Sequence, residues 1–461
     1  MPKSFLYWAL LLLLLADTGY SFLQHYRMPL DGDMAAIIWP SEGYRQVLNN
    51  PFGWRAVFQG ETYPAPNRFF AHLGMTTWFR NVPLWLQGLV SPIDSIYGAC
   101  ALAKTGMQVF LILLLATYIT GSCRLGEKRF LGAALLMAPL FQTAGYNQVM
   151  GIIDKSVTYC FFYALPLGLL MWYLFPLYRS FYLEETRRPG PILLIFLALL
   201  AIVLAFNGPL IPGVVFIVAI LALWNRGRGT GQKPLLVSLA LFGVLCAYSF
   251  YVGRFNAENL SHEIPMIERY LRLPEGLFWQ FARKPGPVLL LIAVLLNALL
   301  IQRTTPDSEG RKILRTLGWI GLFSLLFILL LPLGGYRDYR PNIIRRDTLM
   351  PVFLCLFYFY GLSTRYLWSR LRGVAQKAYW AGVILLLCVF TLSDNFHFPN
   401  NACEREELGR IAASSETVVP LEAGCKVMSW DLPTDPASSE WNALLLEYWG
   451  VTDEKTLFYH K

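Results

Sequence analysis

Long apolar runs separated by short polar connections dominate this 461-residue sequence. A helix of about 17 to 25 mostly apolar residues can cross the hydrocarbon core of a bilayer, because it satisfies its backbone hydrogen bonds internally. The runs are too long and too evenly apolar for the alternating strands of a membrane β-barrel. We expect spans at 4–24, 96–120, 130–146, 156–178, 190–206, 210–225, 234–253, 287–302, 316–333, 348–365 and 378–394. The sequence therefore predicts an all-α, polytopic bundle of eleven transmembrane helices.

The first apolar run follows a short basic start at residues 1–3 and is uninterrupted to Ala16. This pattern also fits a cleaved signal peptide, which is the alternative to a retained helix. No small-x-small cleavage site follows the run, and so we favour its retention as the first span.

Charge and composition indicate how the helices are oriented. The chain is 55% hydrophobic and 15% charged, its net charge is +9, and its mean hydropathy is +0.44. Lys and Arg gather in alternate connections, which is typical of cytoplasmic loops. Those connections are 124–129, 179–188, 226–233, 303–315 and 365–377. We therefore expect an N-terminus inside, a C-terminus outside, contact with membrane lipids rather than nucleic acid, and a multi-pass location in a bacterial inner (plasma) membrane.

Two polar regions should then lie outside the membrane. Residues 1–394 would form the bundle, including an outer loop at 25–93 in which Trp and Tyr alternate with Pro and Gly. That mixture favours short interfacial helices with aromatic rings at headgroup depth. Residues 395–461 would form a short extracytoplasmic tail, in which Cys403 and Cys425 either form a disulfide or remain free thiols.

The outer loop opens with Asp31-Gly32-Asp33. Two carboxylates at this spacing can share a divalent cation, or one can act as a general base while the other orients it. The structural alternative is a turn that ends the first helix, which is a common use of these residue types. Asp31 and Asp33 are therefore the candidate catalytic residues, and a divalent cation is their candidate cofactor.

A second polar cluster lies in the outer loop before the tenth span. Four arginines there run against the bias toward positive charge inside, and so insertion does not explain them. They are Arg337, Arg340, Arg345 and Arg346. A guanidinium group grips phosphate through two parallel hydrogen bonds, which predicts a phosphate or diphosphate site. The alternatives are lipid headgroup binding and internal pairing with Asp338 and Asp347.

Other charged groups are open to a structural interpretation. Residues 254–286 carry mixed charges beside an apolar face, which favours an interfacial helix that covers a site. Lys104 and the pair Asp154-Lys155 either support the site or form structural pairs. The chain has no GxxxxGK[ST], HExxH or GxSxG motif, which argues against ATP hydrolysis, zinc proteolysis and hydrolases of the nucleophile-elbow type.

The order of these parts resembles the GT-C superfamily of membrane glycosyltransferases over roughly residues 1–394. Asp31-Gly32-Asp33 is similar to the acidic signature of that superfamily, and the outer arginines correspond in role to its phosphate-binding basic residues. The chain lacks the Trp-Trp-Asp-Tyr-Gly stretch of oligosaccharyltransferases and has a shorter tail than members with a large outer domain.

The resemblance implies an enzyme that moves a sugar from a polyprenyl-phosphate donor to a glycan, lipid or protein acceptor. Asp31 or Asp33 would accept the proton of the acceptor hydroxyl. The arginines would stabilise the phosphate that leaves. The aromatic candidates for contact with the substrate are Trp39, Tyr44, Trp54, Tyr336 and Tyr339.

Three other functions remain open at this stage. An envelope polysaccharide polymerase or ligase would use the same lipid-carrier chemistry, but with an oligosaccharide donor. A transporter or flippase would place polar groups along the middle of several spans, whereas the charges here concentrate at the outer ends. A non-enzymatic assembly protein would need only the apolar helices.

Overall fold

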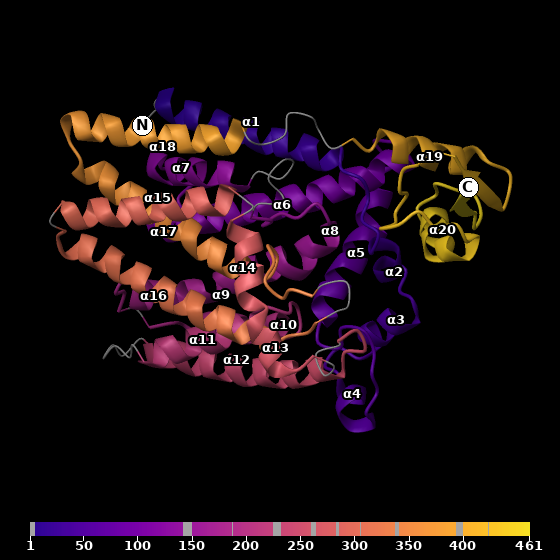
Figure 1. The fold of residues 1–461 in the computed structure, drawn as a ribbon, viewed down its shortest axis with the longest axis horizontal. Coiled ribbons are helices and arrows are strands. Elements are labelled where there is room, and N and C mark those ends of the chain that lie inside the picture. The colour runs from indigo at the N-terminus through magenta and orange to yellow at the C-terminus, as the bar shows by residue number, and fades with distance from the viewer. Residues whose placement is uncertain are drawn as a thin grey trace.

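The chain folds as a bundle of long helices, with a group of short helices and a small C-terminal unit at one end (Figure 1). The structure is a computed structural model that describes residues 5–141, 150–186, 188–224, 232–259, 264–282, 285–304, 306–336, 341–392, 400–422 and 424–461. In these ranges the regular structure is almost all helical, and the two strands are short. The predicted all-α class is therefore confirmed.

A helix lies at each of the eleven predicted spans. These helices are α1 (Phe5–Tyr26), α6 (Pro92–Thr120), α7 (Lys128–Met137), α9 (Leu165–Phe181), α10 (Pro191–Ala205), α11 (Ile211–Trp224), α12 (Gln232–Val252), α15 (Pro285–Arg303), α16 (Ser308–Leu330), α17 (Met350–Arg370) and α18 (Gly373–Leu392). Seven segments of the described chain are long and apolar enough to cross a membrane: Phe5–Tyr26, Pro92–Thr120, Val157–Phe181, Gln232–Phe255, Pro285–Arg303, Ser308–Leu333 and Gly373–Leu392. The helices therefore have the character of a polytopic membrane protein, with seven candidate spans where eleven were expected.

Prolines account for the form of two expected spans. In the span expected at 130–146, α7 gives way to the 3-10 turn η1 (Ala138–Phe141), because Pro139 has no N–H to donate and its ring crowds the preceding turn. Residues 142–146 of that span lie outside the described residues. The span expected at 156–178 begins as α8 (Val157–Tyr159) and the π-helical turn η2 (Cys160–Ala164), before α9 starts next to Pro166.

The first outer loop contains four helices; the first three are short, as predicted, whereas the fourth has 18 residues. They are α2 (Met34–Ile38), α3 (Glu42–Asn49), α4 (Trp54–Gln59) and α5 (Phe69–Leu86). Figure 1 shows α2 to α5 at the same end of the bundle as the C-terminal unit. The two outer regions predicted from the sequence therefore lie at one end of the molecule.

The segment between α12 and α15 is joined to this loop. It contains η3 (Gly253–Phe255), α13 (Met266–Leu271) and α14 (Leu273–Phe281). The Tyr63 amide donates to the Phe255 carbonyl at 3.3 Å, and the Ala257 amide donates to the Tyr63 carbonyl at 3.2 Å. These two backbone bonds connect the first outer loop to the chain that follows α12.

The C-terminal unit, residues 400–422 and 424–461, is a folded element rather than an irregular tail. It consists of α19 (Ala402–Ala413), β1 (Val418–Leu421), the 3-10 turn η5 (Pro436–Ser439), α20 (Glu440–Tyr448) and β2 (Leu457–His460). The strands pair in parallel, with Val418 opposite Leu457. A disulfide joins Cys403 to Cys425, which decides between the two alternatives that the sequence left open.

Trp449 attaches this unit to the outer loop. Its side chain is fully buried, and the indole N–H donates to the Phe79 carbonyl at 2.9 Å. Next to it, the Tyr448 hydroxyl donates to the Arg80 carbonyl at 3.0 Å. A buried aromatic ring with a satisfied polar edge contributes both apolar area and orientation, and so the unit docks on α5 in one position.

Candidate functional site

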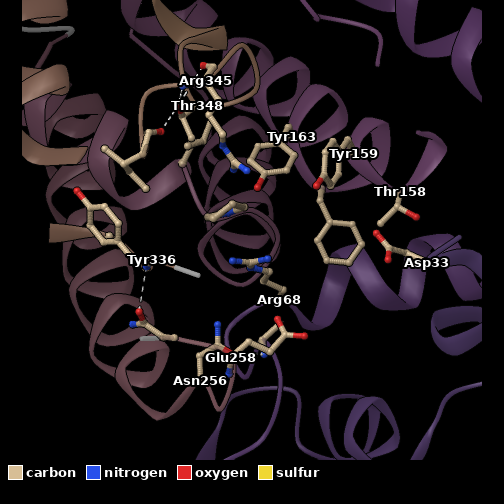
Figure 2. Close-up of a pocket in the computed structure, with 18 of the residues that line it drawn as sticks. Asp33, Arg68, Thr158, Tyr159, Tyr163, Asn256, Glu258, Tyr336, Arg345 and Thr348 are labelled. Atoms are coloured by element: carbon tan, nitrogen blue, oxygen red, sulfur yellow. Dashed lines mark hydrogen bonds between the residues drawn. The ribbon is translucent and has the colours of Figure 1, made fainter. Parts of the chain in front are cut away.

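A cavity of about 270 Å³ lies where the first outer loop meets the bundle. Its walls come from α2, α3 and α5, from α8 and η2, and from the segments after α10 and η3 and before α17. Figure 2 shows Arg68, Glu258, Tyr336 and Arg345 around this cavity, with Asp33 to one side. The cavity is therefore built from parts of the chain that are far apart in the sequence.

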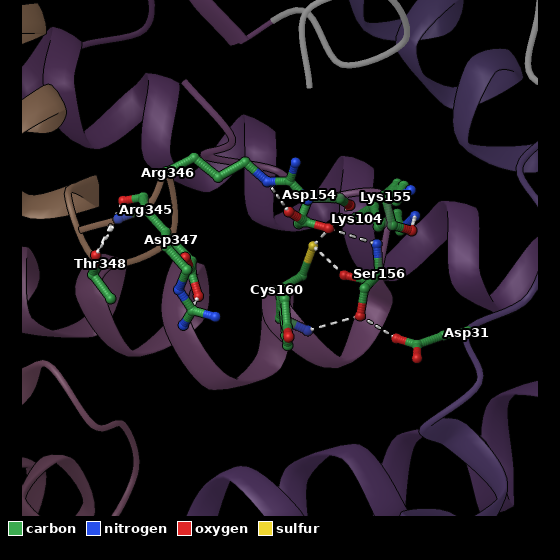
Figure 3. A network of polar contacts seen from close by, with 11 residues as sticks. Asp31, Lys104, Asp154, Lys155, Ser156, Cys160, Arg345, Arg346, Asp347 and Thr348 are labelled. Atoms are coloured by element: carbon green, nitrogen blue, oxygen red, sulfur yellow. Dashed lines mark hydrogen bonds and ion pairs between the residues drawn. The ribbon is translucent and has the colours of Figure 1, made fainter. Parts of the chain in front are cut away.

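The two candidate catalytic acids have different surroundings. Asp31 is buried, with 4% of its surface exposed. Its Oδ2 accepts hydrogen bonds from the Ser156 hydroxyl and from the Thr158 amide, the latter at 2.9 Å, and its Oδ1 accepts from the Asp33 amide at 2.8 Å. Figure 3 shows Asp31 turned toward Ser156. Because three protein donors occupy this carboxylate, Asp31 holds the turn and the start of α8 together.

Asp33 lines the cavity, two residues further along the chain. Its Oδ1 accepts a hydrogen bond from the Trp430 indole N–H at 2.9 Å. The intervening residue has to be small, because a Cβ at Gly32 would lie 2.6 Å from the Trp430 backbone nitrogen. The turn thus directs Asp31 into the protein and Asp33 to the cavity, which supports the structural interpretation for Asp31 and leaves the functional interpretation of Asp33 a prediction.

Two of the four candidate arginines, Arg345 and Arg346, also have different surroundings. Arg345 lines the cavity; one of its terminal nitrogens binds Asp347 Oδ2 at 2.7 Å, while its buried Nε has no hydrogen-bond partner. Thr348 accepts from the Arg345 amide at 2.9 Å and donates to the Ile343 carbonyl at 2.7 Å, which sets the backbone of this loop. Arg345 therefore presents a guanidinium to the cavity that Asp347 only partly satisfies.

Arg346 is directed elsewhere. Its Nε binds Oδ2 of the buried Asp154 at 2.8 Å (Figure 3), and Gly151 leaves the space through which this side chain passes. Lys104, also buried, donates to the Lys155 carbonyl and to the Met28 sulfur. Asp154 and Lys104 therefore hold loops together and do not line the cavity.

Of the aromatic residues predicted to contact the substrate, some line the cavity and others lie elsewhere. Tyr44 and Tyr336 line the cavity. Trp39 packs on the Tyr448 ring at a centroid distance of 5.4 Å, and Trp54 is 53% exposed and stacks on a neighbouring ring of α4. An exposed Trp on a protruding short helix suits a membrane-interface anchor. Arg337, Tyr339 and Arg340 lie outside the described residues.

Two polar side chains that line the cavity are buried without a hydrogen-bond partner. His72 is 1% exposed, neither ring nitrogen has a partner, and the ring lies between Tyr44 and Phe162 at centroid distances of 5.1 and 4.8 Å. Burial, followed by the Arg68 charge, lowers the pKa of His72 to about 3. The Tyr336 hydroxyl is likewise buried without a partner, and burial raises its pKa. A bound polar ligand would satisfy these groups, which otherwise cost free energy.

Sequence reasoning missed Arg68 and Glu258, which both line the cavity. Glu258 accepts from the Tyr44 hydroxyl at 3.2 Å. Arg68 stands outside any charge cluster or motif, and Glu258 lies in the mixed-charge segment 254–286, where no local signal distinguishes it from its charged neighbours. The backbone bonds between the first outer loop and the chain after α12, together with the Tyr44 contact, bring Glu258 to the site.

A divalent cation at Asp31 and Asp33 finds little support in the donor set. Asp31 already accepts from three protein donors, and only Asp33 faces the cavity. The described part of the chain contains no group of three or more His, Cys, Asp or Glu side chains arranged to hold a metal ion.

Comparison with known proteins gives no family to which the chain can be assigned: no protein family and no curated protein matches its sequence. The class of molecule defined by the fold and the site is a helical membrane protein with a charged, aromatic-walled cavity at one end.

Proposed function

We propose that the chain is a membrane glycosyltransferase that moves a sugar from a polyprenyl-phosphate donor to an acceptor at the extracytoplasmic face. The observation that carries the proposal is that Asp33 and Arg345, from two distant outer loops, line one cavity. Its volume of about 270 Å³ is close to the ~300 Å³ at which small-molecule sites begin. Sugar transfer from a phosphate carrier needs a carboxylate to accept a proton and a positive group to bind the phosphate, and one cavity contains both.

Asp33 is the general base in this proposal. It would accept the proton of the acceptor hydroxyl while that oxygen attacks the anomeric carbon of the donor. A new carbon–oxygen bond forms, and the bond between the anomeric carbon and the phosphate oxygen breaks. The polyprenyl phosphate leaves with the electron pair of that bond.

Arg345 and Arg68 would stabilise the phosphate. Figure 2 shows both guanidinium groups directed into the cavity from different walls. Negative charge grows on the phosphate as the sugar departs, and charged donors placed for it act more strongly in a water-poor site than in bulk water. Asp347 holds Arg345 in place but leaves its Nε for a ligand.

The remaining walls suit the two ends of a lipid-linked sugar. Leu210, Leu331 and Ile343 provide apolar surface, whereas Asn256 and His72 provide polar groups. Neutral imidazole has one donor and one acceptor nitrogen, as a sugar hydroxyl requires. This combination supports an amphiphilic donor over an ion or a small apolar molecule.

The test uses the two pairs of neighbouring residues that the structure separates. Purified protein in lipid is assayed with a panel of polyprenyl-phosphate sugars and membrane-extract acceptors. Asp33→Asn should abolish transfer, while Asp31→Asn should lower protein yield and leave measurable transfer in the folded fraction. Arg345→Gln should raise the KM for the donor about tenfold or more, since a charge-assisted hydrogen bond is worth ~1.5–3 kcal/mol. Full transfer by the Asp33→Asn variant would overturn the proposal.

Product length distinguishes the main rival. Addition of one sugar per turnover supports transfer from a monosaccharide donor, whereas en-bloc addition of a repeat unit would identify a polysaccharide polymerase or ligase. Movement of the lipid-linked sugar across the bilayer without a glycosylated product would identify a flippase.

Arg346→Gln is the matched control for Arg345→Gln. It should leave the KM for the donor unchanged, because Arg346 does not line the cavity.

A further inference from the structure

The C-terminal unit touches the Asp31-Gly32-Asp33 turn directly. The Trp430 indole donates to Asp33 Oδ1 at 2.9 Å. The backbone of residues 429 and 430 passes so close to Gly32 that a Cβ there would lie 2.6 to 2.8 Å from it. Asp33, the acid of this turn that lines the cavity, therefore has a partner encoded 397 positions later.

Glu404, at the start of α19, connects the two segments that meet at this point. It is 3% exposed, and its carboxylate accepts three hydrogen bonds. Oε2 accepts from the Leu30 amide at 2.8 Å and from the Tyr97 hydroxyl at 2.7 Å, while Oε1 accepts from the Met428 amide at 2.9 Å. One buried carboxylate thus binds the chain just before Asp31 and the chain just before Trp430.

Met428 has an unfavourable backbone conformation that its hydrogen bonds hold in place. Its φ is +48°, in the left-handed region that side chains other than glycine rarely adopt. Its amide is held by Glu404, and its carbonyl accepts from the Asn442 side chain at 3.2 Å. Unfavourable backbone conformations persist where surrounding contacts over-determine them, and they gather at functional sites.

The Cys403–Cys425 disulfide covalently links the two segments of the C-terminal unit that meet at Glu404. Cys403 precedes Glu404, and Cys425 lies three residues before Met428, so that the bond links the two segments that Glu404 joins by hydrogen bonds. The chain between the two cysteines includes most of α19 and β1. We call Glu404, Met428, Trp430 and the disulfide the clasp.

We propose that the clasp positions Asp33 for catalysis, with Trp430 and Glu404 as positioning residues, so that the C-terminal unit is part of the active site. This inference rests on the proposed function of Asp33. The Trp430 N–H fixes the rotation of the carboxylate and favours its ionised form. Glu404 holds the backbone on both sides of that contact.

Trp430→Phe tests the contact, because it removes the N–H and keeps an aromatic ring at a residue that is 41% exposed. We expect kcat to fall about tenfold with the KM for the donor within twofold, since a hydrogen bond to a charged group is lost. The acidic limb of the pH–rate profile should move to higher pH, and Trp430→His, which retains a ring N–H, should recover part of the rate. Trp85→Phe, at an exposed Trp of α5, is the control. An unchanged kcat and pH profile in Trp430→Phe would overturn the role of Trp430.

Glu404→Gln tests the clasp without any assay of transfer. Hydrogen exchange of residues 28–34 in the full-length protein should accelerate at least tenfold, because an amide NH₂ replaces an oxygen that accepts from Leu30 and Tyr97. Glu416→Gln, at an exposed residue of the same unit, should leave this exchange unchanged. Unaltered exchange in Glu404→Gln would overturn the clasp, whatever the chain catalyses.

The two proposals therefore fail in different ways. Rapid exchange in Glu404→Gln together with full transfer by Asp33→Asn would show that Asp33 is not the general base and that the clasp has a structural role alone.

The disulfide is tested separately. Reduction of the protein, or the double Cys403→Ser/Cys425→Ser change, should reproduce the lower kcat of Trp430→Phe, whereas Cys123→Ser should not. Cys123 is the matched control because it is free and exposed. A reduced protein with unchanged kcat and exchange would remove the disulfide from the proposal.

Discussion

Arg346 and Asp154, 192 positions apart, form an ion pair in which Nε and Oδ2 are 2.8 Å apart and the carboxylate is buried. The bond joins the loop before α17 to the loop before α8. Arg345, its neighbour in the sequence, faces the cavity instead. Two adjacent arginines thus perform different tasks, one in the fold and one in the proposed chemistry.

Arg346→Gln should therefore reduce stability and leave the KM for the donor unchanged. Breaking a buried ion pair leaves the remaining charge uncompensated, at a cost of ~3–5 kcal/mol. Thermal unfolding in detergent measures the loss. The double change Arg346→Gln/Asp154→Asn should recover much of it, because no unpaired charge remains. A single variant with the thermal midpoint of the wild-type protein would contradict this role.

Asp31→Asn should also act on stability. The Asn amide oxygen can take the place of only one carboxylate oxygen, and the NH₂ group at the other place would face the Thr158 amide or the Asp33 amide, which are donors themselves. Such a mismatch at a buried group costs ~1–3 kcal/mol. We expect a lower thermal midpoint and less protein in the membrane than for Asp33→Asn, compared in the same expression system. Equal stability of the two variants would show that the buried contacts of Asp31 contribute little.

His72 predicts the direction of a pH effect on stability. Its folded-state pKa is lowered to about 3 from 6.5, because burial disfavours the charged ring. The unfolded chain therefore binds a proton that the folded chain excludes, and stability should fall as the pH drops from 6.5 toward 3. At 1.36 kcal/mol per pH unit the loss has an upper limit of about 5 kcal/mol. Denaturation measured between pH 7 and pH 4 should show a weaker pH dependence for His72→Phe, and an identical dependence would refute the assignment.

The orientation of the protein can be tested with single cysteines. Ser414, in the C-terminal unit, should lie outside the membrane, whereas Cys123, in the connection between α6 and α7, should lie in the cytoplasm. A membrane-impermeant thiol reagent should label Ser414→Cys in intact cells, and should label Cys123 only after permeabilisation. The opposite pattern would reverse the topology and remove the extracytoplasmic site.

Local patterns predicted most of the helical architecture. The apolar runs located eleven helices, and the mixture of aromatic residues, Pro and Gly predicted the short helices of the first outer loop. The same patterns overestimated continuity at Pro139 and Pro166, where the missing N–H interrupts the helix. The folded C-terminal unit was not predicted, because its packing depends on Trp449 docking on α5 rather than on a long periodic pattern.

The candidate site was predicted only as two sets of residues. The sequence indicated acids near residue 31 and arginines near residue 345, but it gave no reason to choose within either set. Charge and spacing are local properties, and Asp31 and Asp33 are equal by that measure. Arg68 carried no signal because no other charged residue lies near it in the sequence, and Glu258 could not be told apart from the other charged residues of segment 254–286.

By itself, the sequence determined the helical class and the membrane character, since apolar run length and backbone hydrogen bonding decide those directly. Only the tertiary structure decided which acid and which arginine face the cavity. The partners that make that choice, Thr158 and Ser156 for Asp31, Trp430 for Asp33 and Asp154 for Arg346, come from distant segments. A side chain takes its role from the donors and acceptors that folding brings to it, and those are not encoded in its own neighbourhood.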